Sequence, residues 1–207
     1  AASMVSVFKF IKENKDFNGT ISFIITGDEE ADSVNGVKKV VKWLKENNIR
    51  IDGSIATESS SEKIIGDQIK VGRKGAVDVQ VEIIGKQGHA AYPQLAQNPL
   101  HCLSKVISFF DDQKLDDGAE YFEPSTLQFT QINLNNKAKN VIPEKLITVG
   151  DMRFNDNWDQ EKIQNYFDEH LTKICSENNC TYKLKLTFRG MPFQSFDNPF
   201  TKHCIKA

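Results

Sequence analysis

Residues Val77 to Ile83 alternate strictly between aliphatic and polar side chains, in the order Val-Asp-Val-Gln-Val-Glu-Ile. A period of two residues describes a β-strand that buries one face and leaves the other in water. From this point the chain is therefore expected to build a sheet with one wet face.

The elements expected after this strand continue the same domain. They are a helix, two strands, a helix and a strand, over residues 98–113, 125–133, 145–154, 163–174 and 182–188. Asn98-Pro99 supplies a helix cap and a first-turn proline, and Asn178-Asn179 ends the second helix. The order is βαββαβ, the split βαβ arrangement of a ferredoxin-like domain.

The first seventy residues predict a different arrangement. Apolar residues at helical spacing predict a helix over 4–11 and another over 37–44. The apolar run Ile21 to Ile25 predicts a strand buried on both faces, and residues 53–57 predict a second strand. Strand, helix and strand form a βαβ unit, whose two strands run parallel and end at the same edge.

Carboxylates follow both of these strands. Asp28, Glu29 and Glu30 come directly after the first strand, and Glu58 follows the second. One interpretation is that the first three complement the N-terminal dipole of the next helix. The other is that carboxylates meeting at one sheet edge hold a metal ion, with one left free as a general base.

The four histidines differ in their surroundings. His101 and His170 lie in predicted helices and His203 lies near the end of the sequence, so packing or solvation explains them. His89 lies in the loop Gly85-Lys-Gln-Gly-His-Ala-Ala-Tyr-Pro93, which glycines punctuate and a proline closes. A turn histidine and a functional histidine are equally compatible with that loop.

Composition excludes several classes of function. The formal net charge is −2 in 207 residues, so a nucleic-acid partner is not expected. We find no apolar run of membrane-spanning length and no secretory signal, and we expect a cytoplasmic protein without a membrane partner. The four cysteines show no CxxC spacing and are expected to be reduced thiols.

Six short motifs, taken together in order and spacing, resemble the dinuclear zinc aminoacylase and carboxypeptidase family. They are Thr26-Gly-Asp-Glu-Glu30, Glu58-Ser-Ser-Ser, Gly72-Arg-Lys-Gly75, the loop Gly85 to Pro93, Asn98-Pro-Leu-His101 and Asn140-Val-Ile-Pro143. The resemblance implies hydrolysis of an amide bond in an acylated amino acid or a dipeptide. The resemblance does not identify the substrate. The alternative from another class of function is a non-catalytic dimerisation module.

The resemblance also implies roles for individual residues. Glu29 would be the general base, and Glu30 and Glu58 would bind two zinc ions, with cobalt or manganese as alternatives in the second site. His89 would reach across a homodimer and stabilise the oxyanion in the partner's site. Arg73, Asn140 and, more weakly, Arg153 would hold carboxylates of a small-molecule substrate.

The fold class implied is α/β, with a ferredoxin-like dimerisation domain inserted into part of a zinc-exopeptidase-like catalytic domain. We expect the catalytic part at residues 1–72 and 189–207 and the inserted domain at residues 73–188. The family's remaining metal ligands have no counterpart in this sequence. We therefore expect this chain to be an internal part of such an enzyme, with an incomplete metal site.

Overall fold

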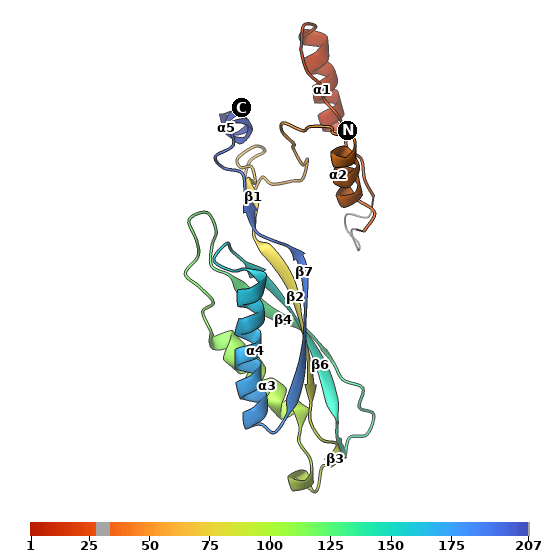
Figure 1. Cartoon of the computed structure of the whole chain (residues 1–207), viewed down its shortest axis with the longest axis vertical. Coiled ribbons are helices and arrows are strands. Elements are labelled where there is room, and N and C mark those ends of the chain that lie inside the picture. The colour runs from red at the N-terminus through yellow and green to blue at the C-terminus, as the bar shows by residue number, and fades with distance from the viewer. Residues whose placement is uncertain (28–33, 207) are drawn as a thin grey trace. The chain divides into compact units, whose positions relative to one another are not determined.

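A computed structural model describes residues 1–27 and 34–206 (Figure 1). The chain divides into two compact units, Ala1–Ile69 and Lys70–Ala207.

The second unit is built on a four-stranded antiparallel sheet. Its strands lie in the order β4, β6, β2 and β7, which are Thr126–Asn133, Lys145–Phe154, Gly75–Ile84 and Thr181–Gly190. The central pair, β2 and β6, is in register from Gly75↔Phe154 to Ile84↔Lys145. The alternation predicted for Val77 to Ile83 is confirmed, because the aliphatic side chains are buried and the polar ones face the other side.

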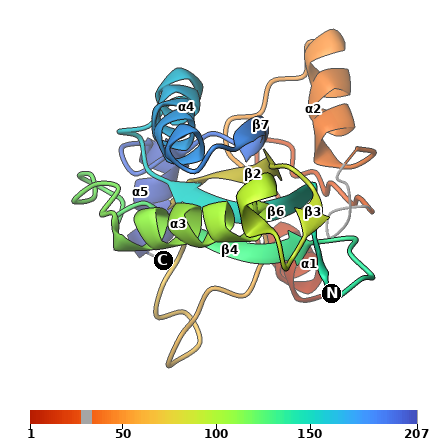
Figure 2. The same ribbon diagram turned by 90° about the horizontal axis from the view of Figure 1, so that it is seen from below.

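Two helices cover one face of this sheet, as Figure 2 shows in the end-on view. They are α3, Pro99–Asp112, and α4, Gln160–Glu177. The side chain of Asn98 caps α3 by accepting a hydrogen bond from the backbone N–H of Leu100, 3.0 Å away. With β2, β4, β6 and β7, these helices complete the order βαββαβ, so the predicted ferredoxin-like arrangement is confirmed.

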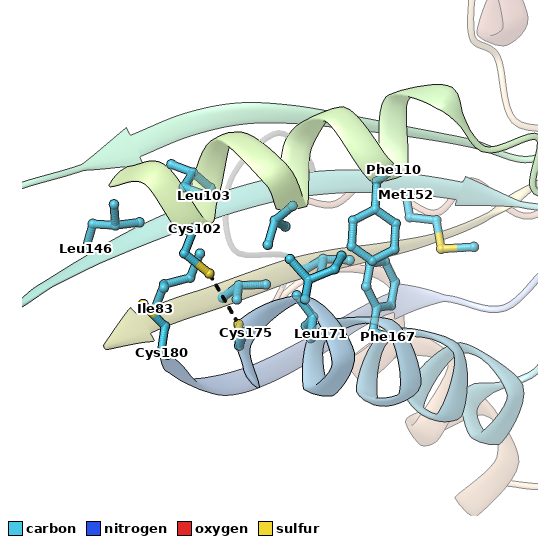
Figure 3. Packing of buried hydrophobic residues seen from close by; sticks show 14 of the residues in the cluster. Ile83, Cys102, Leu103, Phe110, Leu146, Met152, Phe167, Leu171, Cys175 and Cys180 are labelled. Carbon is cyan, nitrogen blue, oxygen red and sulfur yellow. Dashed lines mark hydrogen bonds between the residues drawn. The ribbon is translucent and has the colours of Figure 1, made fainter. Parts of the chain in front are cut away.

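The core lies between the sheet and the two helices (Figure 3). Val77, Val79, Val81 and Ile83 of β2 are wholly buried there. The apolar faces of α3 and α4 meet them with Leu103, Val106, Phe110, Ile163, Phe167 and Leu171. Burial of aliphatic and aromatic surface from both layers is the main source of stability for such a domain.

Two-residue strands and a final helix complete the second unit. β1, Gly72–Arg73, pairs with β8, Phe193–Gln194, and β3, Gly88–His89, pairs with β5, Val141–Ile142. The single 3₁₀ turn η1 spans Pro93–Leu95. The final helix is α5, Pro199–Lys206.

The first unit confirms the two predicted helices. They are α1, Ala2–Glu13, and α2, Val37–Glu46. Across residues 1–27 and 34–206, no helix is both long and apolar enough to span a membrane.

The two strands predicted in the first unit are wrong for the described residues. Residues 20–27 and 53–57 have no strand assignment, and Ile25 is 81% exposed. A strand of a parallel sheet depends on hydrogen bonds to neighbouring strands, and the described residues of this unit contain no such neighbour. Asp28, Glu29 and Glu30, which were expected to share a sheet edge with Glu58, lie outside the described residues.

Candidate functional site

The loop that carries His89 is closed at its base by two backbone hydrogen bonds. The N–H of Lys86 donates to the carbonyl of Gln97, and the N–H of Gln97 donates back to Lys86, both at 2.9 Å. The closure requires glycine at position 85, since an added Cβ would lie 2.1 Å from the carbonyl oxygen of Gln97. Gly88 is equally constrained, with a Cβ there 2.7 Å from that of Ala96.

A second segment, about fifty residues further along the chain, holds this loop in place. β3 pairs with β5 so that His89 lies opposite Val141. The N–H of Ala90 donates to the carbonyl of Asn140 at 2.9 Å, and the N–H of Gly85 donates to that of Glu144 at 2.7 Å. These bonds make the His89 loop a preorganised element at one end of the sheet.

The imidazole of His89 is exposed but has close neighbours on both sides. Its Nδ1 lies 3.1 Å from the backbone nitrogen of Ala91, which donates to it. Its Nε2 lies 3.4 Å from Nδ2 of the Asn140 side chain. The ring of Tyr92 is 5.8 Å away between centroids. The structure thus brings together two of the predicted site residues, His89 and Asn140.

Arg73 and Arg153 lie at the other end of the sheet. Arg73 belongs to β1, just before β2 begins, and Arg153 pairs with Ala76 at the start of β2. His89 follows the far end of the same strand, as Figure 1 shows for β1 and β3. Ten residues of strand span roughly 30 Å, so within one chain the two arginines cannot act on a ligand held by His89.

Arg153 has a partner within the fold. Its Nε donates to the carboxylate of Asp151 at 2.6 Å, and Arg189 also pairs with Asp151 and, at 3.1 Å, with Asp78. Burial opposes ionisation of Asp151, but the hydrogen bonds from Arg153 and Arg189 outweigh it and lower the pKa of this carboxyl. By contrast, the guanidinium of Arg73 lies over Gly190, where a Cβ would be 2.7 Å from its Nη2.

The expected metal ligands are only partly within the described residues. Glu58 is exposed, and Glu29 and Glu30 lie outside the described part. Residues 1–27 and 34–206 contain no group of three or more His, Cys, Asp or Glu side chains that could hold a metal ion. Glu58 by itself does not define a metal site.

The family described as the peptidase dimerisation domain, M20_dimer, matches residues 71–179. This chain belongs to the M20 peptidase dimerisation family. The matched residues contain the complete loop of His89, the segment of Asn140 and most of the ferredoxin-like domain.

Several curated relatives of this M20 chain have the same name. Succinyl-diaminopimelate desuccinylases of Orientia tsutsugamushi (strain Ikeda) and Pelagibacter ubique (strain HTCC1062) are 39% and 36% identical, each over 97% of this chain. The same-named protein of Coxiella burnetii (strain RSA 493 / Nine Mile phase I) is 38% identical over 94%. This chain covers 50%, 52% and 51% of these relatives, and so spans about half of their length.

Solved structures support the M20 fold. Aminopeptidase PepT from Bacillus cereus has a TM-score of 0.74 at 19% identity, and a tripeptidase from Staphylococcus aureus has 0.68 at 21%. Each comparison covers 98% of this chain and about half of the other, 50% and 51% respectively. Together with the family match they confirm the expected fold class, a partial α/β catalytic domain with an inserted ferredoxin-like domain.

Sequence reasoning missed two neighbours of His89. The backbone N–H of Ala91 and the ring of Tyr92 both contact the imidazole or lie beside it. Tyr92 N–H donates to the carbonyl of His89 at 2.9 Å, so a tight turn follows the histidine. This turn is the only sequence signal for the contact between the Ala91 N–H and the imidazole. Nothing in the sequence indicates which ring nitrogen faces that turn.

Proposed function

We propose that this chain is part of a zinc-dependent amidohydrolase that cleaves N-succinyl-LL-2,6-diaminopimelate to succinate and LL-diaminopimelate, in lysine and cell-wall biosynthesis. The observation that carries the proposal is identity of 36–39% along 94–97% of the chain to proteins named for this reaction. A cytoplasmic location, and a partial catalytic domain at residues 1–72 and 189–207 with the inserted domain at 73–188, are parts of the same proposal.

The acidic residues would have two tasks, proton transfer and metal binding. Glu29 would accept a proton from the attacking water and pass it to the leaving amine, while Glu30 and Glu58 would be ligands of two zinc ions. Bound zinc would supply a water that ionises near neutral pH and would polarise the amide carbonyl. The other ligands would come from residues of the enzyme that this chain does not include.

His89 would donate a hydrogen bond to the oxyanion of the tetrahedral intermediate. Its distance from Arg73, roughly 30 Å along β2, supports a dimer in which His89 serves the active site of the partner. Arg73 is exposed and suits a substrate carboxylate, for which the guanidinium fork is adapted. Arg153 would contribute to the same task, although it would have to release Asp151 or share it. Asn140 lies beside His89 and would therefore contact the substrate in the partner's site.

The test is an assay of the full-length gene product loaded with zinc. Succinyl-diaminopimelate should be hydrolysed faster than acetylornithine or any member of a dipeptide panel. A preference for acetylornithine or for a dipeptide would reassign the protein to another activity of the family. Glu29→Gln should abolish turnover and keep the metal, and retained turnover would contradict the role of Glu29 as base.

A non-catalytic dimerisation module is the second candidate. It is favoured by one observation, that the family match covers the dimerisation domain and the chain spans about half the length of its relatives. This candidate predicts a stable dimer in sedimentation and no hydrolysis by the zinc-loaded full-length product. Hydrolysis by that product would exclude it.

A further inference from the structure

The two ring nitrogens of His89 have different partners, and one of these partners can only donate. The backbone N–H of Ala91 points at Nδ1 across 3.1 Å. A ring nitrogen that accepts such a bond must have a free lone pair, so Nδ1 carries no proton. The neutral imidazole therefore carries its proton on Nε2.

The Ala91 donor is fixed by the loop around it. Tyr92 N–H donates to the carbonyl of His89 and Ala90 N–H donates to that of Asn140, both at 2.9 Å. The backbone of Ala91 thus lies between two hydrogen-bonded residues and cannot turn its N–H away without breaking the turn. This donor, and not the side chain on the other side of the ring, decides the tautomer.

The Nε2–H then faces the carboxamide of Asn140, whose nitrogen is placed 3.4 Å away. Two N–H donors that face each other form no hydrogen bond. The nitrogen and oxygen of an amide have nearly the same shape, so turning the carboxamide over costs no packing and places Oδ1 against Nε2–H. In that orientation Nδ1 accepts a hydrogen bond from Ala91 N–H, and Nε2–H donates one to Oδ1 of Asn140. The NH₂ group of Asn140 then points away from the ring.

We infer that the Ala91 N–H and the Asn140 Oδ1 together hold His89 as the tautomer protonated on Nε2, which makes Asn140 a positioning residue for this donor. The statement that the donor serves an oxyanion rests on the proposed function, whereas the tautomer and the amide orientation do not. Asn140 would hold the Nε2–H at one place until a stronger acceptor, such as a developing oxyanion, takes it over.

The tautomer is measurable in this chain without any activity, from ¹⁵N–¹H spectra of the histidine rings at a pH where they are neutral. The expected result for His89 is one tautomer, with the proton on Nε2. Ala91→Gly keeps the backbone N–H and should keep that tautomer. Ala91→Pro removes the N–H and should give a mixture of both tautomers. A proton on Nδ1 in the unmodified chain would overturn the inference whatever Ala91→Pro does to the loop.

The role of Asn140 is tested by two substitutions that leave its backbone bond to Ala90 in place. Asn140→Asp keeps an acceptor, so the His89 Nε2–H should remain hydrogen-bonded and slow to exchange with water. Asn140→Leu has no acceptor, and that proton should exchange faster. Equal exchange in the two variants would contradict the inference.

Turnover of the full-length product separates this inference from the proposed function. Asn140→Leu should lower kcat by between about tenfold and a hundredfold, because a misplaced donor affects the transition state. A change confined to KM would assign Asn140 to substrate binding instead. If His89→Ala leaves turnover unchanged, the proposed role of His89 fails, while the tautomer measured in this chain still decides the inference.

Discussion

The indole Nε1 of Trp158 donates a hydrogen bond to the carboxylate of Asp116 at 2.7 Å, linking the loop after α3 to the start of α4. The other carboxylate oxygen of Asp116 accepts from Asn155 Nδ2 at 2.7 Å and from the backbone N–H groups of Gly118 and Ser125. One carboxylate thus holds three parts of the second unit together.

Removing this carboxylate should destabilise the second unit. Asp116→Ala leaves the indole N–H and the buried amide of Asn155 without their acceptor, which costs roughly 2–3 kcal/mol. Urea unfolding followed by the fluorescence of Trp158 measures the loss. Asp117→Asn is the matched control, because the Asp117 side chain is 88% exposed; it should change stability by less than about 0.5 kcal/mol. Equal effects of the two substitutions would contradict the role assigned to Asp116.

The same carboxylate should make stability depend on pH in the acid range. Burial raises the pKa of Asp116, but hydrogen bonds from Ser125, Trp158 and Gly118 outweigh this and lower it from 3.8 to about 2. The stabilisation is therefore complete above about pH 4 and is lost as the pH falls towards 2. Asp116→Asn should show a smaller loss over this window in urea titrations at successive pH values. An unchanged pH dependence in that variant would show that Asp116 does not titrate as expected.

Arg153 and Asp151 provide a prediction about the outer face of the sheet. Arg153→Gln removes the two hydrogen bonds that Arg153 donates to Asp151 and leaves the one from Arg189, so the pKa of this carboxyl should rise towards its ordinary value. Carboxyl ¹³C shifts measured against pH report this change directly. Lys185→Gln, in β7, is the control on the same face of the sheet, since Lys185 is not among the groups that shift the pKa of Asp151. No movement of Asp151 in Arg153→Gln would contradict the ion pair.

The thiols should separate into two classes of reactivity. Cys102, Cys175 and Cys180 are buried, and Sγ of Cys102 lies 3.7 Å from that of Cys175 (Figure 3). The hydrogen bond with Cys175 and burial raise the pKa of Cys102, and burial raises that of Cys180 to about 11. The hydrogen bond with Cys102 lowers the pKa of Cys175, so burial and not its pKa protects this thiol. Since the reagent must reach a thiolate, an aromatic disulfide reagent should modify Cys204 first and the other three only on unfolding. Rapid reaction of all four would contradict the packing of this core.

The cap of α3 is predictable from the sequence, and its energy can be tested. Asn98→Ala removes the side-chain acceptor of the Leu100 N–H and should cost about 1 kcal/mol. Asn98→Asp keeps an acceptor and should retain most of the stability. Thermal unfolding of the two variants decides the matter, and equal loss in both would mean that the cap contributes nothing.

The ferredoxin-like domain could be predicted because its signals are local. Val77 to Ile83 alternate at the period of a strand, and Asn98-Pro99 marks a helix start to within a residue of where α3 begins. The residues of the Asp116 network lie up to 42 positions apart, and no local pattern connects them. At residues 21–25 a local pattern was present but the prediction was wrong. The apolar run favours a strand, and a strand can form only beside other strands.

The candidate site also has features that the sequence predicts and features that it does not. The motifs identified His89 and Asn140 separately, and the β3–β5 pairing explains why they lie together. The chain order already places Arg73 before β2 and His89 after it. That Arg153 lies at the same end as Arg73 follows from the sheet register, which no residue pattern contains. The orientation of the imidazole depends on one backbone N–H in the turn after it, and a backbone group has no sequence signature.

The closure of the His89 loop should depend on glycine at position 85, which has no Cβ. A Cβ at this position would lie 2.1 Å from the carbonyl oxygen of Gln97, so Gly85→Ala must open the Lys86–Gln97 closure, at a cost of about 1–3 kcal/mol. Hydrogen exchange of the Lys86 and Gln97 amides should therefore accelerate, and the ring signals of His89 should shift. Gly27→Ala is the control, because a Cβ there has no described heavy atom within 4 Å. Unchanged amide protection in Gly85→Ala would mean that the loop is not held by this closure, and that its rigidity comes from the Asn140 segment alone.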